Sequence, residues 1–184
     1  MKTTTLNKIK NCQPHKSMWD NLLKGLEKTE ADDEPLPYAK ILEICGLHDA
    51  IWATCTEYDF WWVKDLAVKY ARRVAHLMKD SRLVVALDVA EQFLRGEIDR
   101  KELDRAWVEV GEAYRACDTE DKVAVYSVVT ACCTISIVSF SGSAIPNLIY
   151  PSYCALETVR LSSGDDAWKI ELEWQEQEFL RMVS

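Results

Sequence analysis

The chain has 184 residues, which is the usual size of one domain and enough to bury a hydrophobic core. Its 22 basic and 30 acidic residues give a net charge of −8, which argues against a general phosphate-binding surface, so no direct nucleic-acid binding is expected. Six glycines and five prolines leave room for few tight turns, which favours long helices over a β-sandwich or barrel.

Residues 1–34 combine a basic segment with an acidic linker, because lysines crowd the start and carboxylates follow them. Ser17 is expected to cap a first helix that turns Trp19 and Leu22 inward. The prolines that follow cannot continue this helix. We therefore place residues 1–34 before a single helical-bundle domain formed by residues 35–184.

Helical spacing of apolar residues runs through most of that domain. The expected helices cover 38–45, 47–57, 59–78, a segment capped by Asp80 and stopped by Gly96, a segment opened by a capping box at Asp99 and Glu102, 153–161, and the chain from Asp165 onward. A loop is expected at 142–151. The predicted fold class is all-α, a multi-helix bundle of about seven to nine helices.

Residues 123–140 form the first part of an uncharged stretch that extends to Leu156, and this part is dense in Val, Ile, Ala and Cys. Serines and threonines interrupt it, and aromatic or basic anchors are missing at its ends, so a buried bundle helix is preferred to a membrane span. A β-hairpin remains open because several of these residues are β-branched.

The seven cysteines do not predict a disulfide framework, because no apolar leader precedes them near Met1. Most of them lie in apolar stretches, where a free cysteine behaves as a small hydrophobic residue. We expect reduced thiols and a cytoplasmic location.

Three segments in the middle of the chain carry a family resemblance: Tyr70-Ala-Arg-Arg-Val-Ala-His-Leu-Met-Lys-Asp-Ser-Arg82, Ala86-Leu-Asp-Val-Ala-Glu91 and Arg95-Gly-Glu-Ile98. This pattern resembles the immunity-protein domains of bacterial polymorphic toxin systems and related phage and prophage proteins. The resemblance extends over about residues 35–183. It implies a helical bundle that binds and neutralises a toxin, or a host-defence protein in the case of a phage.

The expected function is therefore non-enzymatic: an intracellular protein-binding factor of the immunity or inhibitor type, with a protein partner and no membrane association. One alternative is a phage counter-defence inhibitor of a nuclease complex, similar to anti-CRISPR proteins. Another is a metal-binding or enzymatic α-helical domain. The sequence carries no phosphate-binding glycine loop, no dinucleotide fingerprint and no hydrolase elbow, so no cofactor and no catalytic residue are expected.

Two C-x-x-H pairs are the main metal candidates, Cys12 with His15 and Cys45 with His48. Together they could supply four zinc ligands, yet both cysteines also fit the role of core thiols, so no bound metal is expected. A cysteine nucleophile would need one of the few histidines as its base, and no hydrolase signature surrounds any cysteine.

A polar cluster is predicted between two helices, where arginines face paired carboxylates. We expect a structural salt-bridge cluster in which Asp88 compensates a buried arginine, although paired carboxylates could also perform acid–base chemistry in a cleft. Its predicted members, together with the neighbouring Arg72, are Arg73, His76, Arg82, Asp88 and Glu91.

The C-terminal helix is the predicted partner-binding surface. From Asp165 onward it carries six carboxylates and two cations, and an apolar stripe that includes Trp168 and Phe179 should face the bundle. Trp174 would then lie among surface charges as a binding anchor, or pack against its neighbours instead. The candidate contact residues are Asp165, Asp166, Glu173, Trp174 and Glu176.

Overall fold

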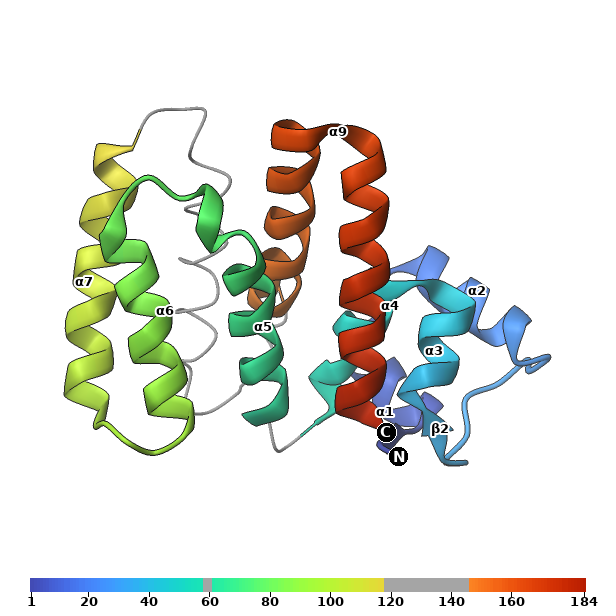
Figure 1. Ribbon diagram of the computed structural model, residues 1–184. Coiled ribbons are helices and arrows are strands. Elements are labelled where there is room, and N and C mark those ends of the chain that lie inside the picture. The colour runs from blue at the N-terminus through green and yellow to red at the C-terminus, as the bar shows by residue number, and fades with distance from the viewer. Residues whose placement is uncertain (58–60, 118–145) are drawn as a thin grey trace.

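The computed structural model describes residues 1–57, 61–117 and 146–184, with only the backbone described for 146–150 (Figure 1). These residues form eight α-helices, two short 3-10 helices and one pair of two-residue strands. The all-α prediction is confirmed. The predicted segment 123–140 lies outside the described residues.

The first part of the chain folds into short elements. They are β1 (Thr3–Thr4), α1 (Leu6–Asn11), α2 (Lys16–Gly25), β2 (Leu36–Pro37), α3 (Tyr38–Cys45), α4 (Leu47–Ala53) and the 3-10 helix η1 (Thr54–Thr56). The sequence did not predict β1, β2 or α1. The two strands pair antiparallel, with Thr3 opposite Pro37, because the prolines hold the second segment extended.

The cap of α2 differs from the prediction. His15, not Ser17, is the N-cap, and its Nδ1 accepts a hydrogen bond from the Met18 backbone N–H at 3.2 Å. Ser17 lies inside the first turn, where its hydroxyl contacts the same ring nitrogen at 2.9 Å. The imidazole therefore satisfies an amide that would otherwise lack a partner at the helix start.

The middle of the chain forms α5 (Trp61–Arg73), the 3-10 helix η2 (Ala75–Leu77), α6 (Ser81–Leu94) and α7 (Arg100–Ala116). The single helix expected over 59–78 is wrong at its end, because after Arg73 the backbone changes to i→i−3 hydrogen bonds. The predicted capping box is confirmed: Glu102 N–H bonds the Asp99 carboxylate at 3.0 Å, and Asp99 N–H bonds that of Glu102 at 3.4 Å.

The last element, α9 (Pro146–Val183), consists of two antiparallel halves that meet at Gly164 (Figure 1). Gly164 has φ 84° and ψ −179°, a conformation that side chains strongly disfavour, so a glycine is needed at this reversal. The loop expected at 142–151 is wrong from Pro146 onward, where the chain is already helical. A proline is compatible with the first helical turn because its N–H would have no partner there.

The helices pack as a row: α7 on α6, α6 on α5, α5 on α9, and α9 on α4 and α3, with α2 beyond (Figure 1). The two chain ends lie together, and the Lys2 N–H bonds the Val183 carbonyl at 2.6 Å. α5 therefore occupies the centre of the described structure.

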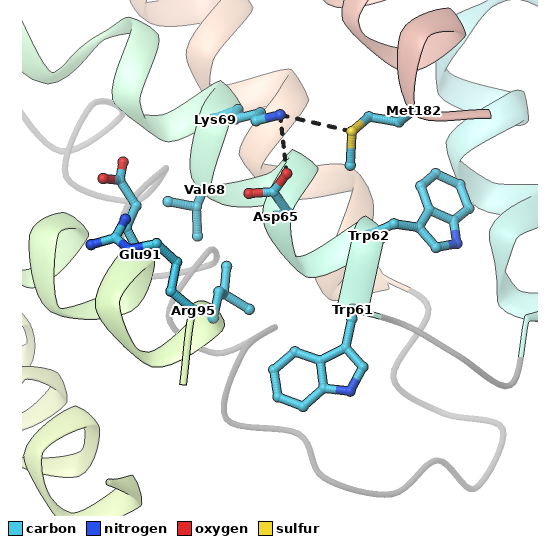
Figure 2. Close-up of a pocket in the computed structure, with 9 residues that line it drawn as sticks. Trp61, Trp62, Asp65, Val68, Lys69, Glu91, Arg95 and Met182 are labelled. Atoms are coloured by element: carbon cyan, nitrogen blue, oxygen red, sulfur yellow. Dashed lines mark hydrogen bonds and ion pairs between the residues drawn. The ribbon is translucent and has the colours of Figure 1, made fainter. Parts of the chain in front are cut away.

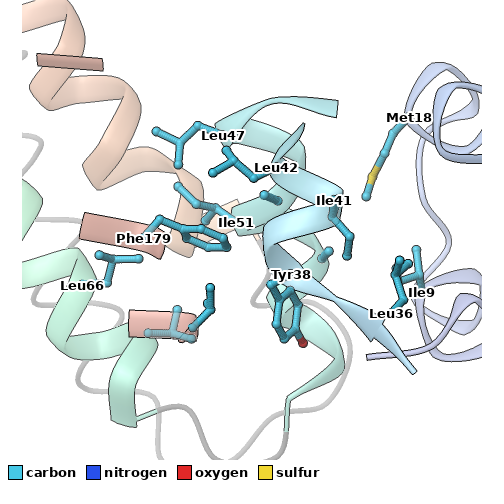
Figure 3. Close-up of a cluster of buried hydrophobic side chains, with 14 of the residues drawn as sticks. Ile9, Met18, Leu36, Tyr38, Ile41, Leu42, Leu47, Ile51, Leu66 and Phe179 are labelled. Atoms are coloured by element: carbon cyan, nitrogen blue, oxygen red, sulfur yellow. The ribbon is translucent and has the colours of Figure 1, made fainter. Parts of the chain in front are cut away.

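Two hydrophobic clusters meet at α5. The larger one joins α1–α4 to Leu66 of α5 and Phe179 of α9 (Figure 3). The smaller one joins the other side of α5, including Val68, to α6 and α7. Leu6, Ile9, Met18 and Leu22 from residues 1–34 are fully buried in the larger cluster, so this segment is part of the same core.

Candidate functional site

The outer side of the second half of α9 is an exposed surface with an excess of negative charge, which we call the acidic α9 face. Asp165, Asp166 and Glu173 are exposed on it, and Glu176 is half-buried beside them. Asp166 contacts Lys169 at 3.2 Å, whereas among the described residues Glu173 and Glu176 have no ion-pair partner. Ile170 adds an exposed apolar side chain.

The remaining two carboxylates of this helix point inward. Glu178 contacts Lys69 of α5 at 2.7 Å and also bonds Arg181. The hydrogen bond from Arg181 is the main reason that the pKa of Glu178 falls to about 2, since burial acts in the opposite direction and the bond from Lys69 adds to the lowering. Of the six carboxylates in this half of α9, the four on the acidic α9 face are therefore the ones that a partner could contact.

A buried polar network holds the two halves of α9 against α5. Gln175 is fully buried, and its amide donates to the Glu171 carboxylate at 3.1 Å while its carbonyl oxygen accepts from the Ser152 hydroxyl at 2.6 Å. Arg73 of α5 donates to the other oxygen of Glu171 at 3.0 Å. Glu171 is only 3% exposed, so it fixes the position of the helix and is not a docking residue.

Trp174 lies at the edge of the acidic α9 face and packs against α5. Its ring meets Tyr70 edge-on with 6.2 Å between centroids, and the Arg73 guanidinium lies 4.5 Å from its centroid. The side chain is half-buried. The structure therefore brings Trp174 together with the predicted carboxylates, but it gives the ring two contacts within the chain.

The predicted polar cluster is divided among three places. Arg72 bonds Asp88 at 2.7 Å and Glu91 at 2.9 Å, which joins α5 to α6. Arg73 points instead to Glu171, and Arg82 pairs with Asp80 at its own helix start. His76 lies exposed in η2. The Asp88 side chain is 52% exposed and the Arg72 side chain 30% exposed. The expectation that Asp88 compensates the charge of a buried arginine is therefore wrong.

The two C-x-x-H motifs meet at one carboxylate. His15 Nε2 lies 3.0 Å from Asp49 Oδ1, and His48 Nδ1 lies 3.4 Å from the same oxygen. Burial alone would raise the pKa of Asp49, but the contacts with His48 and His15 outweigh it and the pKa is lowered. Within the described ranges, no group of three or more His, Cys, Asp or Glu side chains is arranged to hold a metal ion. The expectation of no bound metal stays a prediction.

Three of the described cysteines, Cys45, Cys55 and Cys154, have half-buried or buried thiols. Burial raises the pKa of Cys45 and of Cys154 to about 11, and burial also raises that of Cys55, whose thiol lies beside Cys12. A thiol with a raised pKa carries little thiolate at neutral pH, and the thiolate is the nucleophile. These positions therefore do not favour nucleophilic catalysis.

A groove of about 520 Å³ opens between α5, α6 and the end of α9, and the sequence alone did not predict it (Figure 2). We call it the α5–α6 groove. Its apolar walls come from Trp61, Trp62, Val68, Leu94 and Met182, and its rim carries the charged residues Asp65, Lys69, Glu91 and Arg95.

A model of one protein family, described as "Imm-5 like putative immunity protein", matches residues 60–181, which is well over half of the chain. The chain belongs to this family. No curated protein and no solved structure matches it. The matched region begins beside the groove and includes the acidic α9 face, whereas the elements from β1 to η1 lie outside it.

Membership of the Imm-5 like family indicates an immunity-type function, a protein partner and a role that does not depend on catalysis. No helix among the described residues of this Imm-5 like chain has the length and apolar character needed to cross a membrane. The surfaces that remain for a partner in the described part of the family region include the acidic α9 face and the α5–α6 groove.

Proposed function

We propose that the protein is an immunity factor that binds a protein toxin through the acidic α9 face and thereby neutralises it. The family match over residues 60–181 is the observation that carries this proposal. The toxin would present a basic surface to Glu173 and Glu176, since these carboxylates have no cationic partner in the described part of the chain.

The electrostatics of the surface support binding of a basic partner. The net charge of the chain is −8, and the helix from Asp165 to the end of α9 carries six carboxylates against two cations. Complementary charge accelerates the encounter of two proteins and disfavours partners of the wrong sign. The buried network around Gln175 keeps this helix in place, so the carboxylates are presented on a rigid element.

The first test identifies the partner and its toxicity. We would capture binding proteins from the native host on the immobilised chain, identify them by mass spectrometry, and express each one with and without the chain. The expected result is a protein that stops growth alone and becomes harmless when the chain is co-expressed. If no captured protein is toxic, the proposed function is wrong; capture of a nuclease complex whose activity falls would support the counter-defence alternative.

The second test locates the contact surface on the chain. Glu173→Lys combined with Glu176→Lys should slow association with the captured toxin about tenfold or more at low salt, and the effect should shrink as salt is added. Glu27→Lys with Glu30→Lys is the matched control, because both residues are exposed, have the same i, i+3 spacing and, like Glu173 and Glu176, have no ion-pair partner among the described residues. Equal association rates for the two double variants would place the binding surface elsewhere.

A further inference from the structure

The α5–α6 groove is lined with the residue types that dominate protein-binding surfaces. Trp61 is 51% exposed at its mouth, with its ring centroid 6.1 Å from that of Phe93 on α6. Met182 reaches the opposite wall from the last turn of α9 (Figure 2). Tryptophan, methionine and arginine are enriched at interface centres, and methionine adapts its shape to what it contacts.

The charged groups on the groove rim are paired within the chain. Lys69 contacts Asp65 at 3.0 Å, and its ammonium also donates to the Met182 sulfur at 3.7 Å (Figure 2). A charged side chain entering here would have to disrupt such pairs or remain unpaired in a partly desolvated site. An apolar side chain can cover these pairs without disrupting them.

The other two rim charges are satisfied from neighbouring positions. Glu91 contacts Arg72 at 2.9 Å, and Arg95 contacts Glu97 at 2.6 Å. The rim therefore has two anions and two cations, each with an opposite charge beside it. This balance favours a neutral occupant in the groove itself, whereas the second half of α9, which supplies Met182, has a net charge of −4 from its six carboxylates and two cations.

We propose that the α5–α6 groove receives an apolar anchor, one or two aliphatic or aromatic side chains, from a basic segment of the toxin. This inference rests on the proposed function and names the part of the partner that would enter the groove. Charge would select the partner at two places: the balanced rim favours a neutral anchor, and the acidic α9 face favours lysines or arginines flanking it. A buried anchor surrounded by rim charges is the usual organisation of a binding hot spot.

Affinity measurements on the captured toxin test the anchor. Trp61→Ala and Leu94→Lys should each raise Kd about 30-fold or more, as the loss of a hot-spot contact does. Tyr153→Ala and Val108→Lys are matched controls, since both side chains are exposed and lie outside the groove, and they should change Kd less than about threefold. Circular dichroism melts would establish that each variant is folded.

A photocrosslinker keeps the test decisive if a groove variant fails to fold. We would place p-benzoylphenylalanine at exposed position 95 on the rim or at exposed position 108 on α7, and map the crosslinked toxin peptide by mass spectrometry. The expected product from position 95 is a peptide with an apolar residue flanked by Lys or Arg. Equal crosslinking from both positions, or a peptide with acidic flanks, would overturn the inference.

The two proposals fail in different ways. If the α9 double variant weakens toxin binding while the groove variants bind like the wild type, the anchor is wrong and the proposed function stands. If no toxic partner is captured, both are wrong. A small molecule that occupies the groove and leaves toxin binding unchanged would also overturn the anchor, because the same cavity could not then hold a toxin side chain.

Discussion

Lys69 of α5 and Glu178 of α9 form an ion pair with 2.7 Å between Nζ and Oε1, and it joins the central helix to the last turns of the chain. Both side chains are partly buried, at 30% and 14% exposed. Because Arg181 also bonds Glu178, one carboxylate holds two cations at the edge of the proposed binding surface.

Glu178→Gln should therefore make the free energy of unfolding less dependent on pH in the acid range. Folding lowers the pKa of Glu178 from 4.5 to about 2. The ionised carboxylate therefore stabilises the folded protein fully above pH 4.5, the unfolded pKa, and this stabilisation is lost as the pH falls through the folded pKa. We expect the variant to lose about 1–2 kcal/mol at pH 7, and the difference from wild type to disappear between pH 4.5 and 2.

Urea unfolding at several pH values would measure this difference. Glu173→Gln on the same helix is the control, since Glu173 is exposed and has no ion-pair partner among the described residues. A constant difference between Glu178→Gln and wild type from pH 7 to pH 2 would contradict the ion-pair explanation.

Arg73→Ala should destabilise the fold far more than Asp88→Ala. Removing Arg73 leaves the buried Glu171 carboxylate without its cation, at an expected cost of about 2–4 kcal/mol. Removing Asp88 leaves Arg72 bonded to Glu91, so we expect about 0.5 kcal/mol or less. Thermal and urea unfolding would compare the two variants, and similar losses would mean that Glu171 finds another partner.

The different roles of Arg72 and Arg73 show where sequence reasoning reaches its limit. Consecutive residues on a helix point about 100° apart, so Arg72 faces α6 and Arg73 faces α9. Proximity in sequence suggested one cluster. The partner Glu171 lies 98 positions further along the chain, and only the packing of α5 against α9 reveals the pair.

Local signals predicted local structure well. The helix at 38–45 and the capping box at Asp99 and Glu102 appear as expected, because caps and apolar spacing act within a few residues. The α5–α6 groove could not be predicted, since its walls come from three separate helices. The four outward carboxylates of the acidic α9 face are those that the sequence named, whereas the partners of the inward Glu171 and Glu178 could not be predicted, because Arg73 and Lys69 belong to α5, which is far away in the sequence.

Gly164→Ala and Gly111→Ala should have opposite effects. Gly164 has φ 84°, and we expect a loss of about 1–3 kcal/mol when alanine is forced into this conformation. Gly111 lies inside α7, where a new Cβ would meet only the end of Arg115 at 4.0 Å, so alanine should add up to about 1 kcal/mol. Thermal unfolding would measure both, and a neutral Gly164→Ala would mean that the two halves of α9 can join without this reversal.

Trp174 has two separable roles, support of α9 and direct contact with a toxin. Its ring packs on Tyr70 and under the Arg73 guanidinium, so Trp174→Ala should lose about 2–3 kcal/mol of stability even without any partner. This differs from a purely exposed anchor, which could be truncated without affecting the fold. A thermal midpoint equal to that of the wild type would show that these contacts contribute little.

Trp174→Phe separates the two roles. Phenylalanine keeps an aromatic ring against Tyr70 and Arg73, so we expect stability within about 1 kcal/mol of wild type and a Kd for the captured toxin that changes little. That result would assign Trp174 to support and leave contact to the carboxylates around it. A folded Trp174→Phe that loses toxin binding would instead make the indole a direct anchor on the acidic α9 face, because only the indole offers an N–H donor and the larger ring.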